Sequence, residues 1–203
     1  GEFGHYMLAT VVVSGIYVLV APLFNVIYPR FSALVVTGET AKLIELYRLG
    51  TRLLATVLFS IAIVLALFAE DLVLVWTGDP SLAAPVARII PLLLIGSALN
   101  GVMYFPYALQ LAHGMTWIPL TINAVLMCLL VPGVIYLAHT YGALGGAKAW
   151  MIAEVAYVLL GPWLTHRHIL KGLAPRWLLQ DVCLPLLMAA LIVMAGHGAI
   201  QAG

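Results

Sequence analysis

The side chains that could do chemistry in this chain are a few polar groups set inside long apolar stretches. One stretch carries a row of amides and phenols, namely Asn100, Tyr104, Tyr107 and Gln110. Their steps of four, three and three residues keep them broadly on one side of a helix. Such a row can hydrogen-bond a sugar or a phosphate, or it can join neighbouring helices. Either use requires a helix whose remaining surface is apolar.

Glu154 is the only ionisable residue that lies clearly within an apolar stretch. A charge at the centre of a bilayer costs roughly 2.5 to 3.5 kcal/mol, so such a residue faces a cavity or a partner. Lys148 lies six residues earlier, on a different helical face, so the two do not form an automatic ion pair. Glu154 can pair with a helix outside this chain, titrate as a coupling carboxylate, or bond a polar neighbour. Tyr17, Asn25 and Asn123 add polar groups to two other stretches.

Signatures of enzymes are absent from the sequence. It has no phosphate-binding glycine loop, no His-Glu-x-x-His and no aspartate cluster of the metal-binding kind. His166 and His168 flank Arg167, and we interpret them as part of a basic anchor at a helix end. Cys128 and Cys183 lack a paired spacing and fall in apolar stretches, as packing residues do. We therefore expect transport or lipid handling, with no catalysis, cofactor or metal.

The elements that must position these groups are membrane helices. Of the 203 residues, 64% are hydrophobic and 8% charged, and the mean hydropathy is +1.11, whereas soluble domains carry roughly 25% charged residues. A segment of about 20 apolar residues crosses a bilayer as a helix. The sequence predicts an all-α integral membrane protein with six spans, at 6–28, 53–76, 89–112, 117–138, 145–164 and 177–200. The net charge of +1 gives no indication of a nucleic-acid partner.

Positive charge falls on alternate connectors. Seven of the nine basic residues lie on one side of the predicted spans: Arg30, Lys42, Arg48, Arg52, Arg167, Lys171 and Arg176. Cytoplasmic loops retain Lys and Arg, so this side is expected to be cytoplasmic and both ends of the chain external. An external start without a signal sequence predicts an odd number of helices before residue 1, or a start at Met7.

The connector at 29–52 has an amphipathic pattern. Leu43, Leu46 and Tyr47 fall on one face between residues 41 and 50, with basic residues toward the other. It is expected to lie on the inner leaflet, where each basic charge gains about 1 kcal/mol near anionic headgroups. The alternative is a solvated helix that only joins two spans. The sixth span is the weakest, because Asp181 lies one turn into it.

Several strings, in order, resemble the second half of Wzx-type polysaccharide flippases, which belong to the multidrug/oligosaccharidyl-lipid/polysaccharide superfamily. The matching segments are residues 4–6, 29–34, 38–39, 46–48, 74–78 and 141–147, with the sequences GHY, PRFSAL, GE, LYR, LVWTG and YGALGGA. The resemblance covers about residues 4 to 172. Lys148 departs from the small residue usual at its position in the family.

The resemblance implies a two-lobed transporter with alternating access, of which this chain forms most of one lobe. Its substrate would be an undecaprenyl-pyrophosphate-linked oligosaccharide, moved across the bacterial inner membrane for polysaccharide or lipopolysaccharide (O-antigen) biosynthesis. Its partners would be membrane lipids, the missing N-terminal lobe and the polysaccharide polymerase and export machinery. Tyr17 and Asn25, with Arg30 at the cytoplasmic mouth, would line the cavity. The alternatives are a multidrug or cation antiporter of the same superfamily, and a membrane glycosyltransferase or ligase.

Overall fold

A computed structural model describes the backbone of residues 1–202 and the side chains of residues 1–198. The described chain is helical throughout, and six helices are long and apolar enough to cross a membrane. This confirms the prediction of an all-α membrane protein. The helices are α1 (Glu2–Ser14), α2 (Tyr17–Val36), α3 (Thr40–Leu67), α4 (Ala69–Thr77), α5 (Pro80–Ala87), α6 (Ile90–Val102), α7 (Tyr104–Ala112), α8 (Trp117–Tyr141), α9 (Ala143–His168), α10 (Ala174–Arg176), the π-helical η1 (Trp177–Cys183) and α11 (Leu184–Ala202).

The first span differs from the prediction of 6–28. The helix is interrupted at residues 15–16, and the part that qualifies as a span is Tyr17–Val36. Pro29 was expected to mark the start of a connector, but it lies inside α2. The helix continues because Phe31 is fully buried, with its ring 6.2 Å from that of Tyr47 and 6.1 Å from that of Phe105. Burial of this aromatic ring offsets the hydrogen bond that proline removes.

The prediction of a separate amphipathic connector at 29–52 is wrong. Its second half is the start of α3, which runs without interruption for 28 residues. The amphipathic pattern is present, but Leu43 and Tyr47 pack into the core of the protein and not against a leaflet. Gly50 allows this contact, because a Cβ there would lie 2.3 Å from the ring of Phe105. Packing between helices thus replaces the expected packing against lipid.

The second predicted span, 53–76, is also divided. The α3 helix ends at Leu67, and α4 and α5 follow as a short helical pair. Gly78 makes the turn between them with a φ of +67°. Asp79 accepts a hydrogen bond from the backbone N–H of Ser81 at 2.8 Å and so caps α5. The other four spans agree with the structure to within four residues at each end, over the described part.

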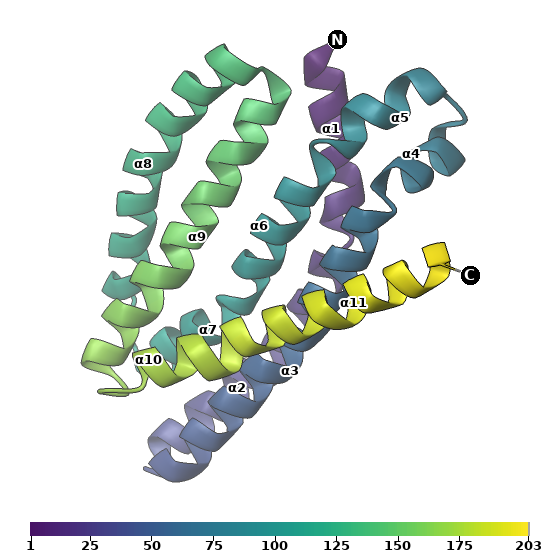
Figure 1. Ribbon diagram of the computed structural model, residues 1–203. Coiled ribbons are helices and arrows are strands. Elements are labelled where there is room, and N and C mark those ends of the chain that lie inside the picture. Colours follow the sequence, from purple (N-terminus) through teal and green to yellow (C-terminus); the bar gives the residue numbers. More distant parts are fainter. Residues whose placement is uncertain (203) are drawn as a thin grey trace.

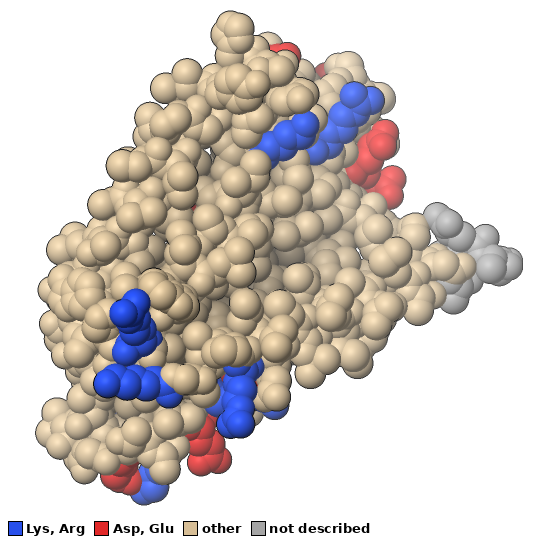
Figure 2. Space-filling view, turned by 60° about the vertical axis from the view of Figure 1, so that its left-hand side comes forward, with Lys and Arg blue, Asp and Glu red and all other residues tan. Residues whose placement is uncertain are grey.

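The two ends of the bundle differ in charge. The connectors after α2, α7 and α9 lie together at one end, which we term the basic end because it holds the seven basic residues named above (Figure 1). The start of α1, the α4–α5 pair and the turn between α8 and α9 lie at the opposite end, termed the acidic end, with Glu70, Asp71 and Asp79. Figure 2 shows charged side chains at both ends of the bundle and an almost uncharged surface between them.

The α6 helix lies at the centre of the bundle. It is the most buried of the six spans and packs against α3 on one side and α9 on the other. Gly96 and Gly101 permit these close approaches, since a Cβ would lie 2.8 Å from the indole of Trp150 and 2.6 Å from the side chain of Leu58. By contrast, α8 contacts mainly α9 and exposes most of its apolar surface. The polar groups of α6 are therefore held in a fixed position.

Candidate functional site

Three polar side chains from three spans form a continuous hydrogen-bonded row in the middle of the bundle. The Tyr17 phenol donates to Asn100 Oδ1 at 3.3 Å. The Asn100 amide nitrogen lies 3.1 Å from both Oε1 and Oε2 of Glu154. We call Tyr17, Asn100 and Glu154 the central row. Glu154 is 5% exposed, so Asn100 donates to a buried carboxyl group while its own carbonyl oxygen accepts from Tyr17.

Glu154 has no ion pair with a Lys, Arg or His within the part of the chain whose side chains are described. A buried carboxylate is costly without a compensating charge. The amide of Asn100 supplies hydrogen bonds but no charge. The group is therefore suited to hold a proton or a small cation, and its affinity for either depends on how open the surrounding structure is.

A cavity of about 220 Å³ adjoins the central row on the side of the basic end. It is lined by Asn100, Met103, Tyr104, Tyr107, Asn123 and Tyr157. The rings of Tyr104 and Tyr107 are fixed by Phe24, whose ring lies 5.8 Å from each of them. The structure thus brings together six of the ten polar residues predicted as candidates: Tyr17, Asn100, Tyr104, Tyr107, Asn123 and Glu154.

Two further cavities lie toward the acidic end. The first, of about 280 Å³, lies between α1, α2, α6 and α9 and includes Tyr17 and Ser97. The second, of about 520 Å³, lies between α1 and the α8–α9 pair. Tyr6 and Trp150 line both, so the two cavities are neighbours. The central row is consequently flanked by cavities on both sides.

The structure places the other four candidates elsewhere. Gln110 is 1% exposed and donates to the hydroxyl of Thr165 at 2.7 Å, which is a contact between helices. Lys148 places its ammonium 3.8 Å from the centre of the Tyr141 ring, near the acidic end. Asn25 and Arg30 are exposed on α2 and do not line the cavity beside the central row.

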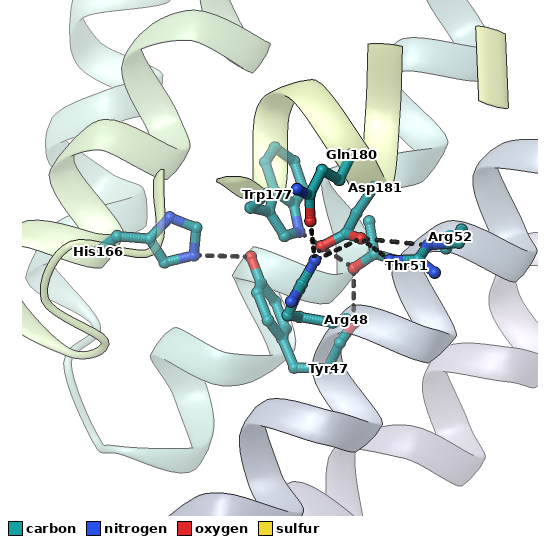
Figure 3. Close-up of polar contacts among 8 residues, drawn as sticks. All are labelled: Tyr47, Arg48, Thr51, Arg52, His166, Trp177, Gln180 and Asp181. Atoms are coloured by element: carbon teal, nitrogen blue, oxygen red, sulfur yellow. Dashed lines mark hydrogen bonds and ion pairs between the residues drawn. The ribbon is translucent and has the colours of Figure 1, made fainter. Parts of the chain in front are cut away.

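A second polar cluster lies at the basic end, and sequence reasoning did not identify it as a cluster. Asp181 of η1 is fully buried, and it accepts hydrogen bonds from Arg48 at 2.8 Å and from Arg52 at 2.7 Å (Figure 3). Arg48 also donates to Gln180 at 2.7 Å. Both arginines belong to α3, one helical turn apart, so a single carboxylate joins α3 to η1 through charge-assisted bonds.

Aromatic and hydroxyl groups extend this cluster to α9. The phenol of Tyr47 lies 3.0 Å from Nε2 of His166, and the Trp177 indole donates to the Thr51 hydroxyl at 3.2 Å (Figure 3). Tyr47 and Trp177 are stacked with ring centres 6.2 Å apart. We call the eight residues drawn in Figure 3 the basic-end network. His166 is 1% exposed, so the prediction that it extends a surface anchor is wrong.

Two signals in the sequence pointed to this network. Arg48 and Arg52 are four residues apart and share a helical face, and Asp181 is the only acidic residue in the last apolar stretch. The pairing itself depends on η1, because the π-helical turns set which way Asp181 points. The sequence of η1 shows no periodic pattern from which a π-helix could be predicted.

No family model matches the chain, and no curated protein or solved structure matches it. Among the described residues, no group of three or more His, Cys, Asp or Glu is placed to hold a metal ion.

Proposed function

We propose that this chain is part of a membrane transporter that moves a lipid-linked oligosaccharide across the bacterial inner membrane by alternating access. The observation that carries the proposal is the central row, which sits between cavities inside an apolar bundle of six potential spans. Amides, phenols and a carboxyl group can hydrogen-bond the hydroxyl groups of a sugar. Cavities on both sides of the central row are suited to a substrate path. The order of the sequence strings that resemble polysaccharide flippases supports the same substrate.

In this proposal the basic end faces the cytoplasm, because seven of nine basic residues lie there. A second lobe, carried by the N-terminal part of the protein, completes the cavity. The polysaccharide polymerase and export machinery are the expected functional partners.

The matched pair Asn100→Leu and Gln110→Leu tests the proposal in the full-length protein. Both residues are amides on the same span, but only Asn100 lines a cavity. We expect Asn100→Leu to reduce surface glycan at least tenfold at matched protein level. For Gln110→Leu we expect nearly normal glycan, with lowered thermal stability. Unchanged glycan in Asn100→Leu, at normal abundance, contradicts the proposal.

A cation antiporter is the second candidate, and one observation favours it. Glu154 is a buried carboxyl group without a basic partner among the described residues, which is an arrangement that can carry a proton or a small cation. Glu154→Gln keeps the hydrogen-bonding shape of the side chain but removes its charge. In proteoliposomes, loss of proton- or sodium-driven drug efflux in this variant, with wild-type surface glycan in cells, supports the antiporter over the flippase.

A further inference from the structure

We propose that the cavity between α1, α2, α6 and α9 is a binding subsite for one neutral sugar ring, with Trp150 as its aromatic platform. The lining includes Tyr6, Thr10, Ser14, Tyr17, Ser97 and Trp150. None of the eight described residues that line it is Lys, Arg, His, Asp or Glu. The inference deepens the proposed function, because it assigns part of the sugar substrate to a defined place.

Three of the five hydroxyl groups that line this cavity already donate their hydrogens within the protein. Thr10 donates its hydroxyl hydrogen to the backbone carbonyl of Tyr6 at 2.9 Å, and Ser14 donates to that of Val11 at 2.7 Å. Tyr17 donates to Asn100. With these hydrogens used, the oxygens offer lone pairs to a ligand. A sugar supplies O–H donors, whereas an ionised phosphate supplies only acceptors. Because its described lining also has no basic side chain to pair with a phosphate, the cavity is suited to the sugar and not to the pyrophosphate.

The indole of Trp150 provides the apolar face that a sugar ring requires. It lies between this cavity and the larger one toward α8, and α6 holds it through Gly96. A Cβ at residue 96 would lie 2.8 Å from Cδ1 and 3.0 Å from Nε1 of the indole. The ring consequently rests against the backbone of α6, and any larger residue at 96 displaces it.

The size of the cavity fits a single ring. At about 280 Å³ it falls just below the range of roughly 300 to 1,000 Å³ that holds drug-sized ligands. The central row forms its inner boundary, because Tyr17 belongs to both. A ring bound here contacts Tyr17, which is linked to Glu154 through Asn100, and this chain of hydrogen bonds couples sugar binding to the state of Glu154.

The test uses the full-length protein in nanodiscs of phosphatidylethanolamine and phosphatidylglycerol, labelled with 5-fluorotryptophan and observed by fluorine NMR. The Trp150 signal is assigned with Trp150→Phe. We expect it to shift saturably with the methyl glycoside of glucose, galactose or N-acetylglucosamine, and to stay in place with inorganic phosphate. Trp163, exposed on the same helix, serves as the internal reference and is expected not to move.

Two variants separate binding at Trp150 from a general effect on folding. Gly96→Ala displaces the indole and is expected to weaken the sugar response at least tenfold. Gly133→Ala on α8 is its control, because a Cβ there meets no atom within 4 Å. A Trp150 signal that ignores all three glycosides, or responds equally to phosphate, overturns the subsite. A sugar response that persists in a protein without oligosaccharide transport leaves the subsite standing and contradicts the flippase proposal instead.

Discussion

Buried polar groups have different kinds of partner in two regions of the bundle: the basic end, and the part from the central row to the acidic end, which we term the acidic half. At the basic end, Asp181 is fully buried but shared by two arginines, and the aromatic groups around it are stacked and hydrogen-bonded. Toward the acidic end, hydroxyl groups border a cavity, and the buried carboxyl group of Glu154 is bonded to Asn100, which lines another cavity. We infer that the basic-end network fixes α3, α9 and η1 together, while the acidic half is free to open.

The partners of a buried charge determine whether it can take part in a conformational change. A buried charge that is paired with opposite charges stabilises one arrangement of the helices. Any other arrangement leaves the charge unpaired, which costs free energy. A buried carboxyl group that is only hydrogen-bonded beside open space can change its charge or its partner with little rearrangement. On this basis we propose that the basic-end network is a structural frame and that the central row is the functional site.

Removal of both basic partners of Asp181 is expected to lower the stability of the protein more than any other change proposed below. The double variant Arg48→Met, Arg52→Met leaves Asp181 buried without a partner, and its cost is expected to be about 3–5 kcal/mol of unfolding free energy. Asp181→Asn is expected to cost less, because the side chains of Arg48 and Arg52 are 25% and 47% exposed and can reach water. Thermal unfolding in detergent measures both.

The control for this prediction is Lys42→Gln. Lys42 belongs to the same helix, and its ion pair with Glu39 is exposed, so its loss is expected to change stability little. A double variant as stable as Lys42→Gln shows that the basic-end network is not a frame.

A smaller effect is expected from Tyr47→Phe. The variant leaves Nε2 of His166 buried without its partner, and an orphaned buried polar group costs about 1–3 kcal/mol. Tyr136→Phe is the matched control, since Tyr136 is 72% exposed on α8. Thermal unfolding of the two variants should therefore differ by several degrees. Equal unfolding temperatures mean that Tyr47 and His166 do not tie α3 to α9.

The smallest effect is expected at the acidic end, where Asp79 caps α5. Hydrogen bonds from the Ser81 hydroxyl and backbone N–H lower the pKa of Asp79. A lowered folded-state pKa stabilises the fold above the unfolded-state value of about 3.9, and the contribution is lost as the pH falls through the folded-state pKa. Asp79→Ala should therefore unfold slightly earlier than wild type at pH 7, and the difference should shrink at pH 3. A difference that grows on acidification contradicts this assignment.

The sequence predicted six spans, and the bounds of four of them to within four residues, because their determinant, a run of about 20 apolar residues, is local. It also grouped Asn100, Tyr104 and Tyr107, which line one cavity, because their spacing has a visible helical period. What it could not predict depends on contacts between distant segments. The interpretation of residues 29–52 as a surface connector failed because the apolar face of Tyr47 is satisfied by Trp177 and His166, over a hundred residues away.

The sequence also could not predict that Asn100 and Gln110 have different surroundings. Both are amides on one side of a span, and their sequence context gives them the same interpretation. They lie on different helices, Asn100 on α6 and Gln110 on α7, and meet different parts of α9. Asn100 then reaches Glu154 beside a cavity, while Gln110 reaches Thr165 in a closed contact. Only the positions of the neighbouring helices decide which amide is accessible.

The most direct test of a fixed basic end and a mobile acidic half is a pair of distance distributions by electron paramagnetic resonance, in full-length protein whose Cys128 and Cys183 are replaced by Ser. One spin-label pair, at Val11 and Ile135, spans α1 and α8, and the other, at Leu49 and Leu179, spans α3 and η1; all four sites are exposed. We predict a broad or two-peaked distribution for the first pair and a single narrow peak for the second. Equally narrow peaks for both pairs, or a broader distribution at the basic end, would show that the basic-end network does not divide the bundle into a fixed and a mobile part.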